Sequence, residues 1–406
     1  MYIRRHIENA VLGRAKEKGA VIVTGARQVG KTTLIKKVKP EIPSITFDDL
    51  SLRTRAIEEP QAFMQLNPPP LFIDELQYVP DIFPYLKISL DTSRRKGEYY
   101  LTGSQSFELM EKVSESLAGR AGILQLAGLS LREMRKEPLD EPFLPTSEHL
   151  LARKERQWEV SISDVWSTIH RGSMPELFVE QGFNWQNFYS DYVKTYLERD
   201  VRKLTQVADE MQFQKFMTVC AAMTGQMLNL ASLARDVGIS VPTAKRWLSI
   251  LRVSGIIYLL KPYSNNAITR AVKTPKLYFL DTGLAAYLTR WLTPDTLAHG
   301  AMSGHYFETF VVAEILKSYW NAGTEEDLYY LRDGNGREID LLLFQDNTLY
   351  PLEIKQQVSP SSKAIATFKL MERIPHVALG EGGVICLSQG LLPLRGDNMI
   401  IPLWAI

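Results

Sequence analysis

Residues 21–38 read VIVTGARQVGKTTLIKKV, and this stretch decides the fold. The β-branched residues at its start predict a strand, and the apolar spacing of Leu34, Ile35 and Val38 predicts a helix. Between the two stands the pattern Gly-x4-Gly-Lys-Thr, over residues 25–32. A strand, a glycine-rich loop and a helix in this order predict a phosphate-binding loop in an α/β domain.

The residue types in this loop suit a nucleoside triphosphate and Mg²⁺. Glycines let backbone N–H groups surround the phosphates, and the helix N-terminus adds positive potential. Lys31 is expected to reach the terminal phosphates, and the Thr32 hydroxyl is expected to bind Mg²⁺. We therefore predict ATP and Mg²⁺ as cofactors, bound by Gly25, Ala26, Arg27, Gln28, Val29, Gly30, Lys31, Thr32, Thr33 and Asp74.

Asp74 and Glu75 follow the apolar strand in PPPLFIDELQYVP, residues 68–80. A doubly wound sheet presents groups to its ligand at this end of its strands. Asp74 would hold Mg²⁺ through water, and Glu75 would orient or deprotonate the water that attacks the γ-phosphate. An acidic turn between a strand and a helix is the competing interpretation.

Two further residues are candidates for the same chemistry. The strand in EYYLTGSQSF, residues 98–107, ends at Thr102 and Ser104, whose hydroxyls could sense the γ-phosphate. The alternative is that Ser104 only helps to form a turn. Arg120 could stabilise transition-state charge in its own chain or in a neighbouring subunit, and a solvated arginine is the alternative.

The middle of the chain predicts helices. Residues 151–212 show helical spacing of Trp, Tyr and Leu and are interpreted as a helical lid over the nucleotide site. Residues 228–263 predict a winged helix-turn-helix, in which Gly238 permits the tight turn and Ser240 caps the second helix. The β-branched sequence GIIYLL would supply the wing.

The second helix would point Thr243, Lys245 and Arg246 outward. Residues 216–275 hold seven basic residues and one acidic residue, a net charge of +6, whereas residues 296–406 hold eight basic and thirteen acidic residues, a net charge of −5. A basic helix-turn-helix favours contact with nucleic-acid phosphates at low sequence specificity. Internal packing or a protein partner is the alternative use of such a unit.

The sequences EIDLLLF and LYPLEIK, joined by QDNT, predict a hairpin near the end of the chain. If Phe344 pairs with Leu349, the register places Asp340 opposite Glu353, with Cβ atoms about 4.5 to 5.5 Å apart. Two carboxylates at that separation repel unless a cation or a proton lies between them. The register therefore predicts either a second divalent metal or a raised pKa.

Two other side chains complete this candidate site. Lys355 lies on the same face as Glu353 and could activate water or stabilise a phosphate. Glu308, early in an apolar helix, could act as a further ligand for the metal. The competing interpretation is a surface ion pair, because the same register sets Glu338 opposite Lys355.

The motifs GARQVGKTT, LFIDELQ, LTGSQSF, AGRAGILQLAGLSLRE and KLYFLDTGLAAYL resemble those of prokaryotic AAA-type ATPases that carry a winged helix and a C-terminal domain of uncharacterised function. The resemblance spans nearly the whole chain. It implies a P-loop ATPase with a restriction-endonuclease-like tail and a homo-oligomer, with a hexameric ring as one arrangement. It also matches Glu308, Asp340, Glu353 and Lys355, in order, with the Glu, Asp and Glu-x-Lys of that endonuclease fold.

The composition agrees with an ordinary globular protein: 406 residues, 45% hydrophobic and 23% charged. No apolar run approaches the ~20 residues that span a bilayer, and no signal peptide is evident, so we expect a cytoplasmic protein. Cys220 and Cys386 are expected to be reduced core residues. The predicted α/β architecture has four parts: an AAA-type P-loop ATPase domain (1–150), a helical lid (151–212), a winged helix-turn-helix (213–290) and a nuclease-like α/β domain (291–406).

The sequence therefore favours an ATP-hydrolysing protein that acts on nucleic acid through a metal-dependent, nuclease-like tail. The alternative is a regulatory module in which the ATP state controls a protein partner and the tail is catalytically inactive.

Overall fold

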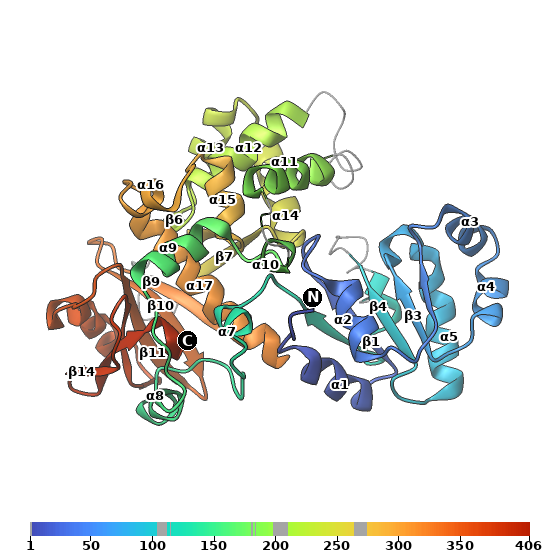
Figure 1. Ribbon diagram of the computed structural model, residues 1–406, viewed down its shortest axis with the longest axis horizontal. Coiled ribbons are helices and arrows are strands. Elements are labelled where there is room, and N and C mark those ends of the chain that lie inside the picture. The colour runs from blue at the N-terminus through green and yellow to red at the C-terminus, as the bar shows by residue number, and fades with distance from the viewer. Residues whose placement is uncertain are drawn as a thin grey trace.

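The computed structural model describes residues 2–103, 112–113, 115–179, 182, 184–197, 210–263 and 274–406. Its N-terminal part is a five-stranded parallel sheet in the order β2-β3-β4-β1-β5, with helices packed around it (Figure 1). The strands are β1 (Ala20–Thr24), β2 (Ser44–Thr46), β3 (Leu71–Asp74), β4 (Tyr99–Thr102) and β5 (Ala121–Gln125). The helices are α1 (Glu8–Glu17), α2 (Lys31–Val38), α3 (Leu50–Glu58), α4 (Pro60–Leu66) and α5 (Phe83–Ser93).

Strand β1 explains why this sheet is covered on both faces. All five of its residues are buried. Val21 and Val23 belong to one apolar core, whereas Ala20 and Ile22 belong to the core on the other face. Side chains alternate along a strand, so a continuous run of small and β-branched apolar residues is what a doubly covered parallel strand requires.

A helical region follows the parallel sheet. Its first part contains α7 (Leu131–Arg135), α8 (Ser147–Lys154), α9 (Ile162–Arg171), α10 (Glu176–Val179) and α11 (Trp185–Tyr196). The helix-turn-helix unit then runs α12 (Glu210–Ala222), β6 (Gln226–Met227), α13 (Leu230–Val237), α14 (Val241–Val253), β7 (Ile257–Pro262) and β8 (Lys276–Phe279). Helices α15 (Thr282–Leu288) and α16 (Pro294–Ala298) lead to the C-terminal part.

The C-terminal part shares one sheet with the helix-turn-helix unit. Its strands are β9 (Leu328–Arg332), β10 (Glu338–Gln345), β11 (Thr348–Lys355), β12 (Ala378–Leu379), β13 (Gly382–Cys386), β14 (Leu392–Arg395) and β15 (Asn398–Pro402). The sheet runs β14-β15-β13-β11-β10-β9-β7-β8-β6, with β12 paired to β11. The join is the parallel pairing of β7 with β9, at Lys261 with Tyr329 and Pro262 with Tyr330. The 3-10 helices are Leu76–Tyr78, Pro80–Ile82, Ser362–Arg373 and Leu403–Ala405.

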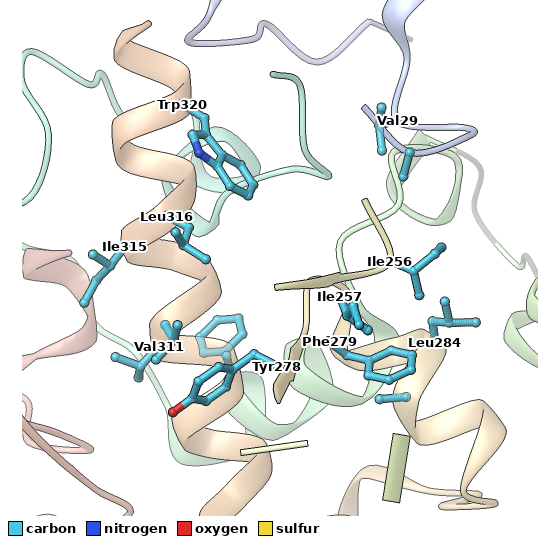
Figure 2. Close-up of a cluster of buried hydrophobic side chains, with 14 of the residues drawn as sticks. Val29, Ile256, Ile257, Tyr278, Phe279, Leu284, Val311, Ile315, Leu316 and Trp320 are labelled. Carbon is cyan, nitrogen blue, oxygen red and sulfur yellow. The ribbon is translucent and has the colours of Figure 1, made fainter. Parts of the chain in front are cut away.

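Helix α17 (Ser303–Ala322) ties these parts together. It is buried on almost every side and contacts β8 and β11 as well as α1 and β5 of the N-terminal part. Figure 2 shows one apolar cluster that reaches from Val29 in the phosphate loop, through Ile256 and Ile257, to Leu316 and Trp320 of this helix. In the part of the chain that the structure describes, no helix is long and apolar enough to cross a membrane.

Buried polar contacts reinforce this join. Glu314 of α17 accepts a hydrogen bond from the backbone N–H of Leu131 at 2.7 Å. Lys317 donates to Glu314 at 2.8 Å and to the carbonyl of Leu129 at 2.9 Å. Because these groups are buried and satisfied by one another, the helix has a fixed position against α7.

Arg5 fixes the phosphate loop to the same region. Its guanidinium donates to the carbonyl of Val29 at 2.8 Å, to Ala127 at 2.8 Å and to Gly128 at 3.2 Å. It also forms an ion pair with Glu133 of α7 at 3.0 Å, and both side chains are almost fully buried. One side chain therefore connects the N-terminal segment, the loop and α7.

Replacing Arg5 with Met should lower the free energy of unfolding by about 3 to 5 kcal/mol, because it leaves the carboxylate of Glu133 buried without its cation. Urea denaturation measures the change. Arg4→Met is the matched control, since the neighbouring Arg4 side chain is 78% exposed and lies 3.9 Å from its acidic partner. Equal effects of the two substitutions would contradict the assignment.

Candidate nucleotide and carboxylate sites

The phosphate loop leaves β1 and enters α2, as the sequence predicts. Gly25 has φ 146° and Gly30 has φ 93°. A Cβ atom on Gly25 would lie 2.1 Å from the carbonyl oxygen of Leu126, so the first glycine is needed for close packing as well as for its backbone angle. Lys31 is buried, and its ammonium donates to the carbonyls of Gly25 at 3.1 Å and Ala26 at 2.7 Å. The cation is therefore held at the loop itself.

Thr32, Asp74 and Thr102 meet at the carboxyl edge of the sheet. The strand order sets β4 between β1 and β3, so the ends of these strands are neighbours. Thr32 donates to the carboxylate of Asp74 at 3.0 Å, and Thr102 donates to the same carboxylate. This cluster offers a hydroxyl and a carboxylate for Mg²⁺ beside the phosphate loop. Ser104, the other predicted hydroxyl, lies outside the described residues.

Glu75 directly follows this cluster in the chain. It has φ 59°, a left-handed conformation that is uncommon for a residue with a side chain and that occurs at ligand sites. Gln77 donates a hydrogen bond to its carboxylate. Glu75 lines a cavity of about 300 Å³ together with Lys31 and, from α11, Tyr192 and Thr195. Helix α11 falls within the segment predicted to cover the nucleotide.

Arg120 does not face the phosphate loop of its own chain. Its carbonyl accepts a hydrogen bond from the N–H of Ala20, so it lies at the start of β1 and β5, whereas the loop follows their far ends. Its guanidinium pairs with Asp91 of α5 at 2.5 and 2.9 Å. The five residues of β1, at ~3.3 Å each, place Arg120 and the phosphate loop at opposite edges of the sheet. The predicted role within the same chain is therefore wrong, and only the role in a neighbouring subunit stays a prediction.

The helix-turn-helix geometry follows the capping residues of the sequence. Gly238 ends α13 in a left-handed conformation with φ 86°, and Ser240 caps α14 by accepting from the N–H of Thr243 at 3.2 Å. Lys245 and Arg246 are exposed, whereas Thr243 is partly buried and its hydroxyl bonds to that of Ser240 at 2.8 Å. Strands β7 and β8 pair in an antiparallel manner, and the residues between them, 264–273, lie outside the described part.

The end of α14 lies against the phosphate loop. A Cβ atom on Gly255, in the turn between α14 and β7, would come 3.2 Å from the backbone nitrogen of Ala26. Gly255 has φ 69°, so both its backbone angle and this contact favour glycine. The helix-turn-helix unit is thus a direct neighbour of the predicted nucleotide site.

The C-terminal hairpin has the predicted register. Phe344 pairs with Leu349 and Leu341 with Leu352, which continues to Asp340 beside Glu353. Asp340 also lies where β10 has one more residue than β9, an irregularity of the kind that re-aims side chains near functional sites. Asp340 and Glu353 are 8% and 3% exposed, so two carboxylates are buried close together.

Lys355 lies between these two carboxylates. Its ammonium is 2.8 Å from Oδ2 of Asp340 and 2.7 Å from Oε2 of Glu353. The N–H of Ile354 also donates to Oδ2 of Asp340 at 2.9 Å. The alternative of a surface ion pair between Lys355 and Glu338 is therefore wrong.

Glu338 is instead held by Lys276, a residue that the sequence did not single out. Lys276, on β8, lies 2.6 Å from Glu338 and 2.7 Å from Oε1 of Glu308. The Tyr278 hydroxyl donates to the same Oε1 at 2.6 Å. The sequence did hold a signal for this role, since Lys276 begins the otherwise apolar strand KLYF. A lysine is rarely buried without an acidic partner, so its position indicates a buried ion pair.

The pKa values follow from burial and from these neighbours. Burial and the charge of Asp340 raise the pKa of Glu353 to about 8. Burial, with a contribution from Asp340, also raises the pKa of Glu308. Burial opposes ionisation of Asp340, but Lys355 and Lys276 outweigh it and lower its pKa. Asp340 is thus the carboxylate that stays ionised most readily.

The donor set fits a divalent metal in its chemistry. Across the described ranges, no group of three or more acidic, His or Cys side chains has the arrangement of a metal site. Mg²⁺, however, commonly uses one or two carboxylates and retains several waters. The ammonium of Lys355 already marks a cation position between Asp340 and Glu353, and no described donor reaches Oδ1 of Asp340 or Oε2 of Glu308. Asp340 and Glu308, the two carboxylates with an open oxygen, would hold the metal.

Comparison with known families divides the chain into three matched segments. Residues 17–135 match an AAA domain. Residues 162–295 and 303–406 each match a domain of unknown function, DUF8612 and DUF4143 respectively.

Two curated relatives, uncharacterized proteins of Mycobacterium tuberculosis and Mycobacterium bovis, are each 29% identical over 367 residues, covering 89% of this chain and 76% of theirs. Among solved structures, a Walker-type ATPase of Pyrococcus abyssi is 16% identical with a TM-score of 0.44, covering 71% of this chain and 96% of its own. Thermotoga maritima RuvB is 17% identical with a TM-score of 0.31, covering 62% and 85%. The strand order, the phosphate loop and the family match identify residues 17–135 as an AAA-type P-loop ATPase domain.

Proposed function

We propose that the chain hydrolyses ATP with Mg²⁺ and uses the nucleotide state to act on nucleic acid. The cluster of Thr32, Asp74 and Thr102 beside the buried Lys31 carries the first part. Lys31 would release the loop carbonyls and bind the β- and γ-phosphates, and Thr32 and Asp74 would hold Mg²⁺. Glu75 would position the attacking water.

Lys31→Ala should lower the rate of ATP hydrolysis by roughly 100-fold or more, because it removes a charged donor from the developing phosphate charge. Steady-state release of phosphate measures the rate. Lys36→Ala, an exposed lysine of the same helix, should leave turnover unchanged. Unchanged turnover in Lys31→Ala would refute ATP hydrolysis at this loop.

The nucleic-acid part of the proposal rests on the helix-turn-helix unit. Three helices and the antiparallel strands β6, β8 and β7 occur in the order expected of a winged helix. The exposed side chains of Lys245 and Arg246 supply two cations for phosphate contacts, and the local charge of +6 adds a favourable potential. Strand β7, which contains most of the sequence GIIYLL, would supply the wing.

The double substitution Lys245→Ala and Arg246→Ala should weaken duplex DNA binding and reduce the salt dependence by about two phosphate contacts, a slope change of about 1.8 in log affinity against log salt. Fluorescence anisotropy over a salt series measures both. The control is the double substitution Lys36→Ala and Lys37→Ala, which removes two consecutive exposed lysines from α2. If the wild-type chain has no salt-dependent DNA affinity, a protein partner becomes the better assignment.

We also propose that the C-terminal site is a metal-dependent nuclease of the restriction-endonuclease-like class. The buried set of Asp340, Glu353 and Lys355 on one hairpin supports it. A bound divalent cation would polarise a phosphate and generate a nucleophilic hydroxide. Lys355 would then move from the carboxylates to stabilise the phosphate charge. The net charge of −5 in this part means that the helix-turn-helix unit would supply the grip on nucleic acid.

Asp340→Asn should abolish Mg²⁺- or Mn²⁺-dependent cleavage of single- and double-stranded DNA and RNA, because it removes the most readily ionised carboxylate. Gel electrophoresis of labelled substrates measures cleavage. Asp346→Asn, in the exposed turn of the same hairpin, is the matched control. If wild-type protein leaves every substrate intact, the tail is an inactive scaffold.

That outcome would favour the second candidate, a regulatory module in which ATP controls a partner. The ion pairs of Lys355 with Asp340 and Glu353, and of Lys276 with Glu308 and Glu338, support it, because each carboxylate already has a cation. For either function we propose a homo-oligomer, in which Arg120 could reach the nucleotide of a neighbouring subunit.

A further inference from the structure

The carboxylate site draws two residues from outside the C-terminal part of the chain. Lys276 and Tyr278 belong to β8, the strand that pairs with β7 in the helix-turn-helix unit. They lie two residues apart and therefore point to the same face, toward α17. Both donate to a single oxygen, Oε1 of Glu308. The site is thus composite, with strands from two different parts of the chain.

Lys276 is buried among acidic groups that it neutralises. The residue is 4% exposed, and its ammonium lies 2.7 Å from Glu308 and 2.6 Å from Glu338. The remaining oxygen of Glu338 pairs with Arg332 at 2.9 Å. A buried ion pair of this kind stabilises a fold only weakly compared with an apolar replacement, so stability alone does not account for a lysine here.

The two donors leave one oxygen of Glu308 open. Both bind Oε1, and no donor in the described ranges lies within hydrogen-bonding distance of Oε2. Without Lys276, Glu308 would keep only the hydrogen bond from Tyr278. With Lys276 in place, two donors fix Oε1 and thereby set the direction in which Oε2 points.

A second contact fixes the strand against the helix at the neighbouring residue. Thr309, next to Glu308, shares a hydrogen bond of 2.9 Å with the hydroxyl of Thr224. Thr224 in turn accepts from the N–H of Phe279 on β8 at 3.0 Å. The position of β8 therefore determines where Lys276 meets Glu308.

We propose that Lys276 is a positioning residue of the C-terminal site, which holds Glu308 beside Asp340 with Oε2 open to a divalent cation. The inference rests on the proposed metal-dependent function of that site. It makes the metal affinity of the C-terminal part depend on a strand of the helix-turn-helix unit. A nucleic acid that shifts β8 would then change the metal site directly.

Isothermal titration of the full chain with Mn²⁺, without nucleotide, tests this directly. All variants carry Thr32→Ala, so that the phosphate loop lacks its hydroxyl ligand. Lys276→Met should weaken Mn²⁺ binding about 10- to 100-fold, the usual effect of removing a group that orients a metal ligand. Lys276→Arg should restore most of the affinity, because it returns a cation to Glu308. Lys261→Met, an exposed lysine on the neighbouring strand β7, should bind Mn²⁺ as the parent does.

Circular dichroism shows whether each variant is folded. If Lys276→Met does not fold, Tyr278→Phe provides the test, because it removes one donor to Oε1 of Glu308 and retains the aromatic ring. Tyr278→Phe should weaken Mn²⁺ binding by a smaller factor than Lys276→Met. Unchanged Mn²⁺ affinity in a folded Lys276→Met, or in Tyr278→Phe where only that variant folds, would overturn the inference.

The same titration separates this inference from the proposed function. If Asp340→Asn abolishes Mn²⁺ binding while folded Lys276→Met retains it, the metal site stands and the role of Lys276 is wrong. If the parent chain binds no Mn²⁺, both the metal site and the role of Lys276 are wrong.

Discussion

The burial of α17 is the constraint on which the rest of the structure depends. One helix of 20 residues contacts the ATPase sheet, the helix-turn-helix sheet and the C-terminal hairpin. A helix that is buried on almost every side needs neighbours on every side, so all three parts pack around it. The same helix carries Glu314 at the ATPase side and Glu308 at the carboxylate site, fewer than two turns apart. The two candidate sites therefore belong to one packed body.

The strand, loop and helix around residues 21–38 could be predicted well because the pattern that specifies them is local in sequence. The loop from Gly25 to Thr32 is continuous in sequence, and Asp74 ends a strand whose apolar run is unmistakable. The position of Arg120 at the wrong edge was also accessible in principle, since the strand that includes Ile123 and Leu124 follows it in the chain and does not precede it. A residue before a parallel strand lies at the opposite edge from a residue after it.

The carboxylate site shows where sequence reasoning stops. The register of Asp340 and Glu353 could be predicted because the short sequence between the two strands fixes their pairing. In the structure, Asp346 and Asn347 form this two-residue turn, both with positive φ. The ion-pair partner of each charged side chain could not be predicted from the sequence. Lysine is long and flexible, and its choice among nearby carboxylates depends on which of them another cation already holds. Lys276 comes from a strand some sixty residues before the hairpin in the chain, and only the tertiary packing places it there.

The shared sheet also bears on how the chain can be divided. The pairing of β7 with β9 joins the helix-turn-helix sheet to the C-terminal sheet through backbone hydrogen bonds. A chain cut between these parts would expose two unpaired strand edges, and such edges template association between molecules. Fragments that end at the boundary between the two matched families would thus be prone to aggregation. A piece of the chain that keeps the pairing of β7 with β9 contains both the helix-turn-helix unit and strands of the carboxylate site, so the two are better studied together.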